Sequence, residues 1–258
     1  CAEVGALPQR EGVDFGVIDR RLAVAGQLIR LSGADGPVDD IFLPLYGAHQ
    51  AANAGQALAA VEAFLGLKAL HPDVVREGFA QVRLPGRLEL VRRSPAVVLD
   101  AAHNPHGARA AAAAITEAFA FTPLIGVVAV MADKDARGVL EAFEEIMNQV
   151  VITQVASTSR GMPAEVLREL AAEVFGASRV TVVPRLDDAI ERAVALAEAD
   201  VVGSAGVLIT GSVIAISEAR TLLVKDEPVP VPSANRNLDD GWDADYSEDG
   251  HETDRDWR

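Results

Sequence analysis

The feature that most constrains this chain is a regular alternation between residues 96 and 223. Short apolar, β-branched runs are expected to form strands at Ala96–Asp100, Leu124–Met131, Val150–Val155, Val180–Val183 and Gly206–Thr210. Segments with helical spacing follow them at Pro105–Phe119, Gly138–Met147, Pro163–Phe175, Leu186–Ala199 and Val213–Leu223. Because apolar strands separated by helices are typical of a parallel sheet covered on both faces, the sequence predicts an α/β fold. We expect a mostly parallel sheet flanked by helices.

The residues before this series have a different pattern. Phe15–Arg20 and Leu22–Leu31 are expected to pair as a hairpin, and Ile41–Tyr46 to form a third strand. Two helices are expected after them, at Ala51–Leu65 and Pro72–Val82.

The end of the chain, residues 226–258, is strongly acidic. It carries −8 of the net charge of −15 and opens with the proline-rich run E-P-V-P-V-P. Without apolar periodicity, this segment is predicted to be a disordered tail, with Trp242 and Trp257 solvated. The acidic balance argues against general nucleic-acid binding, which needs a basic face.

Composition narrows the cellular setting. No apolar run approaches the roughly 20 residues of a membrane helix, so we expect a soluble, cytoplasmic protein without a membrane partner. The single cysteine, Cys1, excludes a disulfide framework and a multi-cysteine zinc site. A start at Cys1 rather than at methionine favours a fragment or a processed piece.

The loop after the first strand of the series carries the most chemistry. Asp100 is followed by A-A-H-N-P-H-G, in which Asn104 suits a helix N-cap and Pro105 the first helical position. The free N–H groups of that helix end attract phosphate or carboxylate, which places Asp100 and His103 at the mouth of an anion site. The alternatives are a capping carboxylate and a surface histidine. A metal site of Asp100, His103 and His106 is less favoured, because Pro105 interrupts the spacing.

The usual phosphate-binding loops are missing from the sequence. None of the three lysines, Lys68, Lys134 and Lys225, follows a glycine, so there is no G-x-x-x-x-G-K-[ST]. No G-x-G-x-x-G follows an expected strand either. Taken alone, the sequence does not hold ATP phosphates in the usual way.

Four ordered motifs resemble those of the Mur ligase superfamily. The run L-Y-G-A-H-Q-A-A-N-A at 45–54 resembles its G-x-H-Q-x-x-N-A signature. P-G-R-L-E at 85–89 with D-A-A-H-N-P at 100–105 is similar to folylpolyglutamate synthases, including forms that are also dihydrofolate synthases. D-K-D at 133–135 and I-T-G-S at 209–212 fit the same family in order. The resemblance runs from about residue 15 to residue 223.

This resemblance implies an ATP-dependent amide ligase that adds L-glutamate to folates through an acyl phosphate, with ATP and magnesium as cofactors. It implies that residues 1–82 end a central ATPase domain, that 83–225 form a C-terminal Rossmann-like ligase domain, and that 226–258 follow as a tail. The phosphate loop, the magnesium ligands and most of the pteridine site are expected in a missing N-terminal ATPase half. No metal ligand is therefore expected here, and this chain alone is expected to be inactive.

The family's site residues carry over by motif. Asn53, Arg87 and Asp100 resemble its ATP contacts, and His103 and Lys134 its catalytic positions. The chemistry agrees for Arg87, because a guanidinium can fork onto phosphate oxygens. Each has a simpler alternative: Asn53 bonds a neighbouring loop, Arg87 is a solvated surface arginine, and Lys134 belongs to a turn ion pair.

A second polar loop follows the strand at Val150–Val155. Ser157, Ser159 and Arg160 are candidates to bind the substrate carboxylates, with a plain polar turn as the alternative. Two other functions stay open for the chain: a non-catalytic Rossmann-like nucleotide-binding module, and a Mur-type ligase for another carboxylate. P-G-R combined with D-A-A-H-N-P favours folate.

Overall fold

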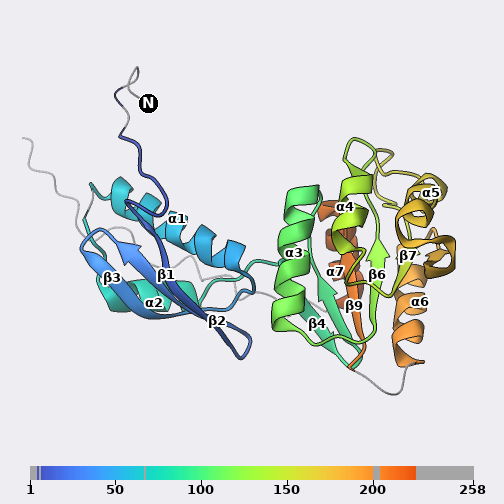
Figure 1. Cartoon of the computed structure of the whole chain (residues 1–258), viewed down its shortest axis with the longest axis horizontal. Coiled ribbons are helices and arrows are strands. Elements are labelled where there is room, and N and C mark those ends of the chain that lie inside the picture. Colours follow the sequence, from blue (N-terminus) through green and yellow to red (C-terminus); the bar gives the residue numbers. More distant parts are fainter. Residues whose placement is uncertain (1–4, 6, 67, 200–203, 225–258) are drawn as a thin grey trace, which may run out of the picture. The chain divides into compact units, whose positions relative to one another are not determined.

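The computed structural model describes residue 5 and residues 7–66, 68–199 and 204–224. Within this part the strands form two sheets, one of three strands and one of six (Figure 1). The acidic segment 226–258, with its two tryptophans, lies outside the described residues, so its predicted disorder stays a prediction. No helix of the described part is long and apolar enough to cross a membrane.

The three-stranded sheet is an antiparallel meander of β1 (Gly16–Ala23), β2 (Gly26–Gly33) and β3 (Gly36–Leu43). The predicted hairpin was right, but its turn lies at residues 24–25 rather than near residue 21, and β3 ends three residues before Tyr46. The shift of the first turn has a local cause, because Ala25 adopts a φ of 62° and supplies the left-handed residue that this turn needs.

Two helices cover this sheet, α1 (Ala48–Phe64) and α2 (Pro72–Ala80). The core between them and the strands is built from alternating residues of β2 and β3 together with one face of each helix. It includes Leu31, Ile41, Leu43, Leu58 and Val75.

The second sheet has the strand order β4-β5-β9-β6-β7-β8. Its strands are β4 (Glu89–Arg93), β5 (Ala96–Leu99), β6 (Leu124–Val128), β7 (Gln149–Ile152), β8 (Val180–Val182) and β9 (Gly206–Thr210). All neighbouring pairs are parallel except β4 with β5, which confirms the predicted mostly parallel α/β sheet. The antiparallel edge strand β4 was not predicted.

Helices cover both faces of this sheet (Figure 1). They are α3 (Pro105–Ala118), α4 (Ala136–Phe143), α5 (Ala164–Phe175), α6 (Leu186–Glu198) and α7 (Val213–Leu223). Leu208 of β9 packs into the core under α3, α4 and α5, whereas its neighbours Val207 and Ile209 pack under α6 and α7. This alternation is what a strand buried on both faces requires.

The carboxyl ends of β5, β9 and β6 are tied together by backbone hydrogen bonds. The N–H of Asp100 donates to the carbonyl of Ile209 at 3.0 Å, and the N–H of Gly211 donates to the carbonyl of Ala102 at 3.1 Å. The loop that starts at Asp100 is therefore fixed at the edge of the sheet where ligands of α/β proteins bind.

Candidate functional site

A pocket of about 290 Å³ lies between the first turns of α1 and the loop that leads into α3. Its lining includes Asn53, Arg87, Asp100 and His103, so the structure brings together the three predicted ATP contacts and one predicted catalytic residue. Sequence reasoning did not select three further lining residues, His49, Gln50 and His106, as site residues. His49 and Gln50 stand inside the G-x-H-Q-x-x-N-A motif, which was the signal that could have found them.

The N-terminus of α3 forms one wall. The side chain of Asn104 accepts a hydrogen bond from the N–H of Gly107 at 2.8 Å, and Pro105 occupies the first turn, which confirms the predicted start of this helix. Gly107 itself lines the pocket. Pro105 has no N–H, and Gly107 and Ala108 donate to Asn104, so the N–H of His106 and the positive end of the helix dipole make this wall favourable for an anion.

Asp100 is 5% exposed, and both of its carboxylate oxygens accept backbone hydrogen bonds. One comes from the N–H of Leu88 at 3.1 Å and the other from the N–H of Ala102 at 2.9 Å. Burial raises the pKa of Asp100, while these two bonds and the charge of Arg87 act in the opposite direction. Asp100 therefore fastens the P-G-R-L loop to the strand end, as the capping alternative proposed, and it keeps free lone pairs toward the pocket.

The P-G-R turn aims Arg87 at the pocket. Gly86 has a φ of 70°, and a Cβ there would lie 2.7 Å from Cγ2 of Ile216, so only glycine fits this position. Within the described residues the exposed guanidinium of Arg87 has no hydrogen bond or ion pair, and its charge contributes to the lowered pKa of His49. An unpaired guanidinium beside a helix N-terminus is well suited to phosphate oxygens.

The histidines of the pocket differ in their environment. Burial lowers the pKa of His49, and the charges of Arg87 and His106 lower it further, so His49 is neutral at pH 7. The Nδ1 of His103 lies 3.0 Å from the carbonyl oxygen of Ala101. In the neutral ring Nδ1 then carries the hydrogen and donates it, which leaves Nε2 as the free acceptor.

Asn53 projects from α1 into the same pocket. Its Nδ2 donates to Oε1 of Gln50 at 3.2 Å, within the same helix. The simpler alternative for Asn53 was a bond to a neighbouring loop. The structure shows instead a bond to Gln50, one turn away in α1.

Lys134 and the loop at 157–160 lie outside this pocket. Lys134 and Arg160 share the carboxylate of Asp133, at 3.3 Å and 3.7 Å, which is the turn ion pair that was the alternative for Lys134. The N–H of Ser157 donates to Glu218 at 2.9 Å, and Ser159 is exposed. The lysine loop is nonetheless close to the pocket wall.

Gly138, in the first turn of α4, shows how near the loop of Lys134 lies to the start of α3. A Cβ on Gly138 would lie 2.6 Å from Cγ of Pro105, so the first turns of α3 and α4 touch. The D-K-D loop, which leads directly into α4, is therefore next to the loop that carries His103.

A metal centre gains no support from the part of the chain that the structure describes. No group of three or more His, Cys, Asp or Glu side chains there is placed to hold an ion. The alternative of Asp100, His103 and His106 as ligands is not realised in that part.

The chain resembles known proteins over most of its described length. Residues 86–213 match the model of the Mur ligase glutamate ligase domain. The chain is 46% identical over 229 residues to the dihydrofolate synthase/folylpolyglutamate synthase of Mycobacterium tuberculosis, covering 84% of the chain and 47% of that protein. It is 28% identical to folylpolyglutamate synthase of Lacticaseibacillus casei, covering 86% of the chain and 50% of that protein. It thus spans about half the length of these relatives.

Solved structures agree. Mycobacterium tuberculosis folylpolyglutamate synthase complexed with ADP aligns with a TM-score of 0.81 at 46% identity, covering 84% of this chain and 49% of that one. Escherichia coli FolC in complex with DHPP and ADP aligns with a TM-score of 0.69 at 28% identity, covering 86% and 48%. The four motifs, the sheet and these matches give one answer: the chain belongs to the folylpolyglutamate synthase and dihydrofolate synthase family of Mur ligases.

Proposed function

We propose that this chain is the C-terminal part of an ATP-dependent ligase that adds L-glutamate to folates, and that the pocket is its half of the nucleotide site. The observation that carries the proposal is the convergence of Asn53, Arg87, Asp100 and His103 on one pocket from motifs far apart in the sequence. Support comes from relatives that are named for this activity and from relatives solved with ADP.

Each pocket residue has a role that its surroundings favour. Arg87, exposed and without a partner in the described part, binds phosphate oxygens, and the start of α3 adds the N–H of His106 and the positive end of its dipole to the same anion. Asp100 holds the loop of Arg87 in place and accepts from ribose hydroxyls with its remaining lone pairs. Asn53, on α1, contacts the base. His103 offers Nε2 to the reacting end of the nucleotide.

The reaction proposed is a two-step amide synthesis. ATP transfers its terminal phosphoryl group to a folate carboxylate, which gives an acyl phosphate and ADP. The amine of glutamate then attacks the acyl carbon and expels inorganic phosphate, which leaves the amide and releases a proton. Lys134, Ser157, Ser159 and Arg160 lie on loops at the same end of the sheet, and we assign them to the acyl phosphate and the glutamate carboxylates.

The domain assignment forms part of the proposal. Residues 1–82 complete an ATPase domain, residues 83–225 form the ligase domain, and 226–258 are a tail. The phosphate loop and the magnesium ligands come from the N-terminal half of the enzyme, where magnesium neutralises phosphate charge. The cytoplasm, which supplies ATP, is the proposed compartment.

Nucleotide binding by the 258-residue chain tests the half-site. A fluorescent ADP analogue, followed by anisotropy, should bind saturably and about ten-fold or more weakly to Arg87→Ala, because a charge-assisted contact is lost. The matched control is Arg92→Ala, since Arg92 lies five residues away and pairs with Glu198 at 3.2 Å. No binding by the unmodified chain, or equal loss in both variants, would count against the proposed site.

A further inference from the structure

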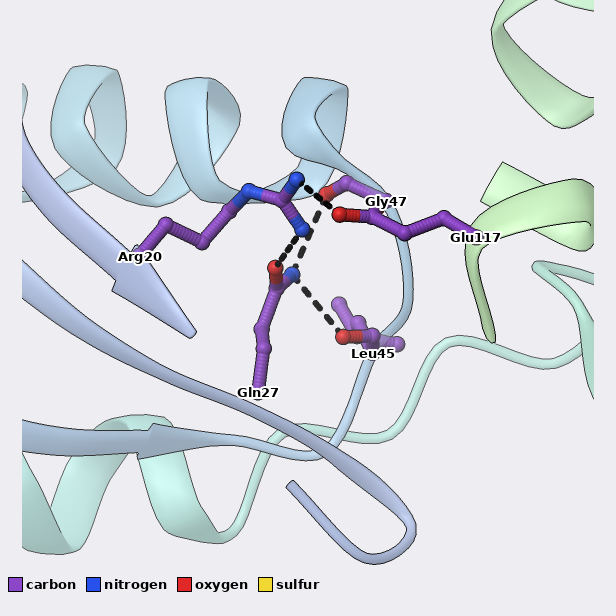
Figure 2. A network of polar contacts seen from close by, with 5 residues as sticks. All are labelled: Arg20, Gln27, Leu45, Gly47 and Glu117. Atoms are coloured by element: carbon purple, nitrogen blue, oxygen red, sulfur yellow. Dashed lines mark hydrogen bonds and ion pairs between the residues drawn. The ribbon is translucent and has the colours of Figure 1, made fainter. Parts of the chain in front are cut away.

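A polar network outside the pocket joins β1, β2, the loop before α1 and the last turn of α3 (Figure 2). Arg20 of β1 donates through Nη1 to Oε1 of Gln27 at 3.1 Å. Its Nη2 pairs with Oε1 of Glu117, on α3, at 2.5 Å. One guanidinium thus connects the three-stranded sheet with a helix of the six-stranded sheet.

Gln27 fixes the orientation of this network. It is fully buried, and its Nε2 donates to the carbonyls of Leu45 at 2.9 Å and of Gly47 at 3.1 Å. Because both amide hydrogens are used on carbonyls, the amide oxygen must face the other way, toward Arg20. The same side chain therefore holds the loop before α1 and orients the guanidinium.

Gly47 connects this loop to the start of α1. Its carbonyl also accepts from the N–H of Gln50 at 3.1 Å and of Ala51 at 3.4 Å, which are the first bonds of the helix. Gly47 has a φ of 94°, and a Cβ there would lie 2.7 Å from Cβ of Ala114. The loop is thus pressed directly against α3, one turn before Glu117.

The pocket lies immediately beside these contacts. His49, Gln50 and Asn53, in the first turns of α1, form one wall. Residues of the first two turns of α3, among them Ala111, form the other, and Ala114 and Glu117 follow further along the same helix. The ion pair therefore joins the two parts of the chain that carry these walls.

We propose that Arg20 and Glu117 are positioning residues of the nucleotide pocket. Their ion pair holds the first turn of α1 at the separation from α3 at which both walls contact one ligand. The pair is partly exposed, with side chains 21% and 36% accessible, so its effect on overall stability is small. The inference rests on the proposed function for the identity of the ligand, but the separation of the helices is independent of it.

A distance measurement on the 258-residue chain tests the positioning. Cys1 is replaced by serine, cysteines are placed at the exposed positions Ala60 of α1 and Ala113 of α3, and spin labels report the separation. Glu117→Ala should broaden or lengthen the distance distribution with little change in melting temperature. It is the main variant because it leaves Gln27 and its loop intact, whereas Arg20→Ala also removes a contact of a buried amide.

The matched control is Arg30→Ala, which removes an arginine whose partner, Asp39 at 2.6 Å, lies in the same sheet. It should leave the distribution as in the unmodified chain. The fluorescent ADP analogue should bind about two- to five-fold more weakly to Glu117→Ala than to this control, the range expected for a partly exposed pair, and less so at high salt.

The outcomes separate the two proposals. An unchanged distance distribution in Glu117→Ala overturns the positioning role, and so does a changed distribution with unchanged nucleotide affinity. If the unmodified chain binds no ADP, the proposed nucleotide site fails, and the distance distribution alone decides whether the pair positions the helices.

Discussion

Removing the carboxylate of Asp100 should destabilise the chain, whether or not a ligand is bound. The side chain is buried, and its two oxygens are the acceptors for the N–H groups of Leu88 and Ala102. Leu88 is itself 2% exposed and has a φ of 45°, so this N–H cannot reach water without moving a strained turn.

The magnitude follows from the two donors left behind. A buried donor that loses its partner costs about 1–3 kcal/mol, so the loss of two such partners in Asp100→Ala should lower the free energy of unfolding by about 2–6 kcal/mol. The recovered cost of burying the carboxylate, which is what raises its pKa, offsets part of this and favours the lower half of the range. Asp100→Asn keeps one acceptor oxygen and should lose about half as much.

Urea unfolding followed by circular dichroism measures this effect. The control is Asp133→Ala, because Asp133 is an exposed carboxylate on the next loop and its loss should leave the urea midpoint nearly unchanged. The urea slope should be the same for all variants if only stability changes. An Asp100→Ala variant as stable as the control would refute the reasoning and leave Asp100 as a ligand contact alone.

Three further predictions concern pH, catalysis and the tail. Burial raises the pKa of Asp100 above its ordinary value of 3.8, so the folded chain binds this proton more readily than the unfolded chain. The stability of the unmodified chain relative to Asp100→Asn should therefore fall as pH rises through the interval between the folded and unfolded pKa values, and then stay level. Urea unfolding from pH 3.5 to 7 measures this difference, and a rise with pH would contradict the prediction. In an enzyme that contains this half, Arg87→Ala should lower kcat/KM for ATP about 10- to 150-fold, and Arg87→Lys should recover only part of this loss, because an ammonium cannot make a forked contact. Steady-state kinetics measures both variants, and full activity of Arg87→Lys would show that no forked contact is made. Deleting residues 226–258 should leave the melting temperature nearly unchanged, because the segment has too little apolar content to bury much surface. A drop of several degrees in a thermal scan would contradict this and show that the segment is structured.

The six-stranded sheet was largely predictable, and the reason is physical. Strands buried on both faces must be apolar throughout, and helices between them must show one apolar face, so each element carries its own signal. Edge strand β4 carries no such signal: E-L-V-R-R is mostly charged, and its register shifts between Leu90 and Arg92. The hairpin turn was misplaced because Ala25 supplies the left-handed residue without any glycine or asparagine in that position.

The residues of the site could be predicted from motifs, but their arrangement in space could not. Arg87, Asp100 and His103 stand in short motifs, and Asn104 and Pro105 announce the helix start, so one wall of the pocket could be placed from sequence. The second wall depends on how α1 packs against α3, which no local pattern encodes. Gln27 illustrates this limit, because a glutamine within a strand is typical of a solvent-facing position, yet this one is fully buried and holds two backbone carbonyls.

The position of β9 has a consequence for synthesis of the chain. Among the strands of the described residues, β9 (206–210) is the last to leave the ribosome, yet it lies between β5 and β6 and pairs with both. Until it emerges, β5 and β6 have no strand to join them, and the backbone edges with which both pair to β9 stay open to water. A nascent or truncated chain that ends before residue 206 should therefore be a substrate for chaperones and proteases, and the six-stranded sheet should close only after residue 210 has left the ribosome.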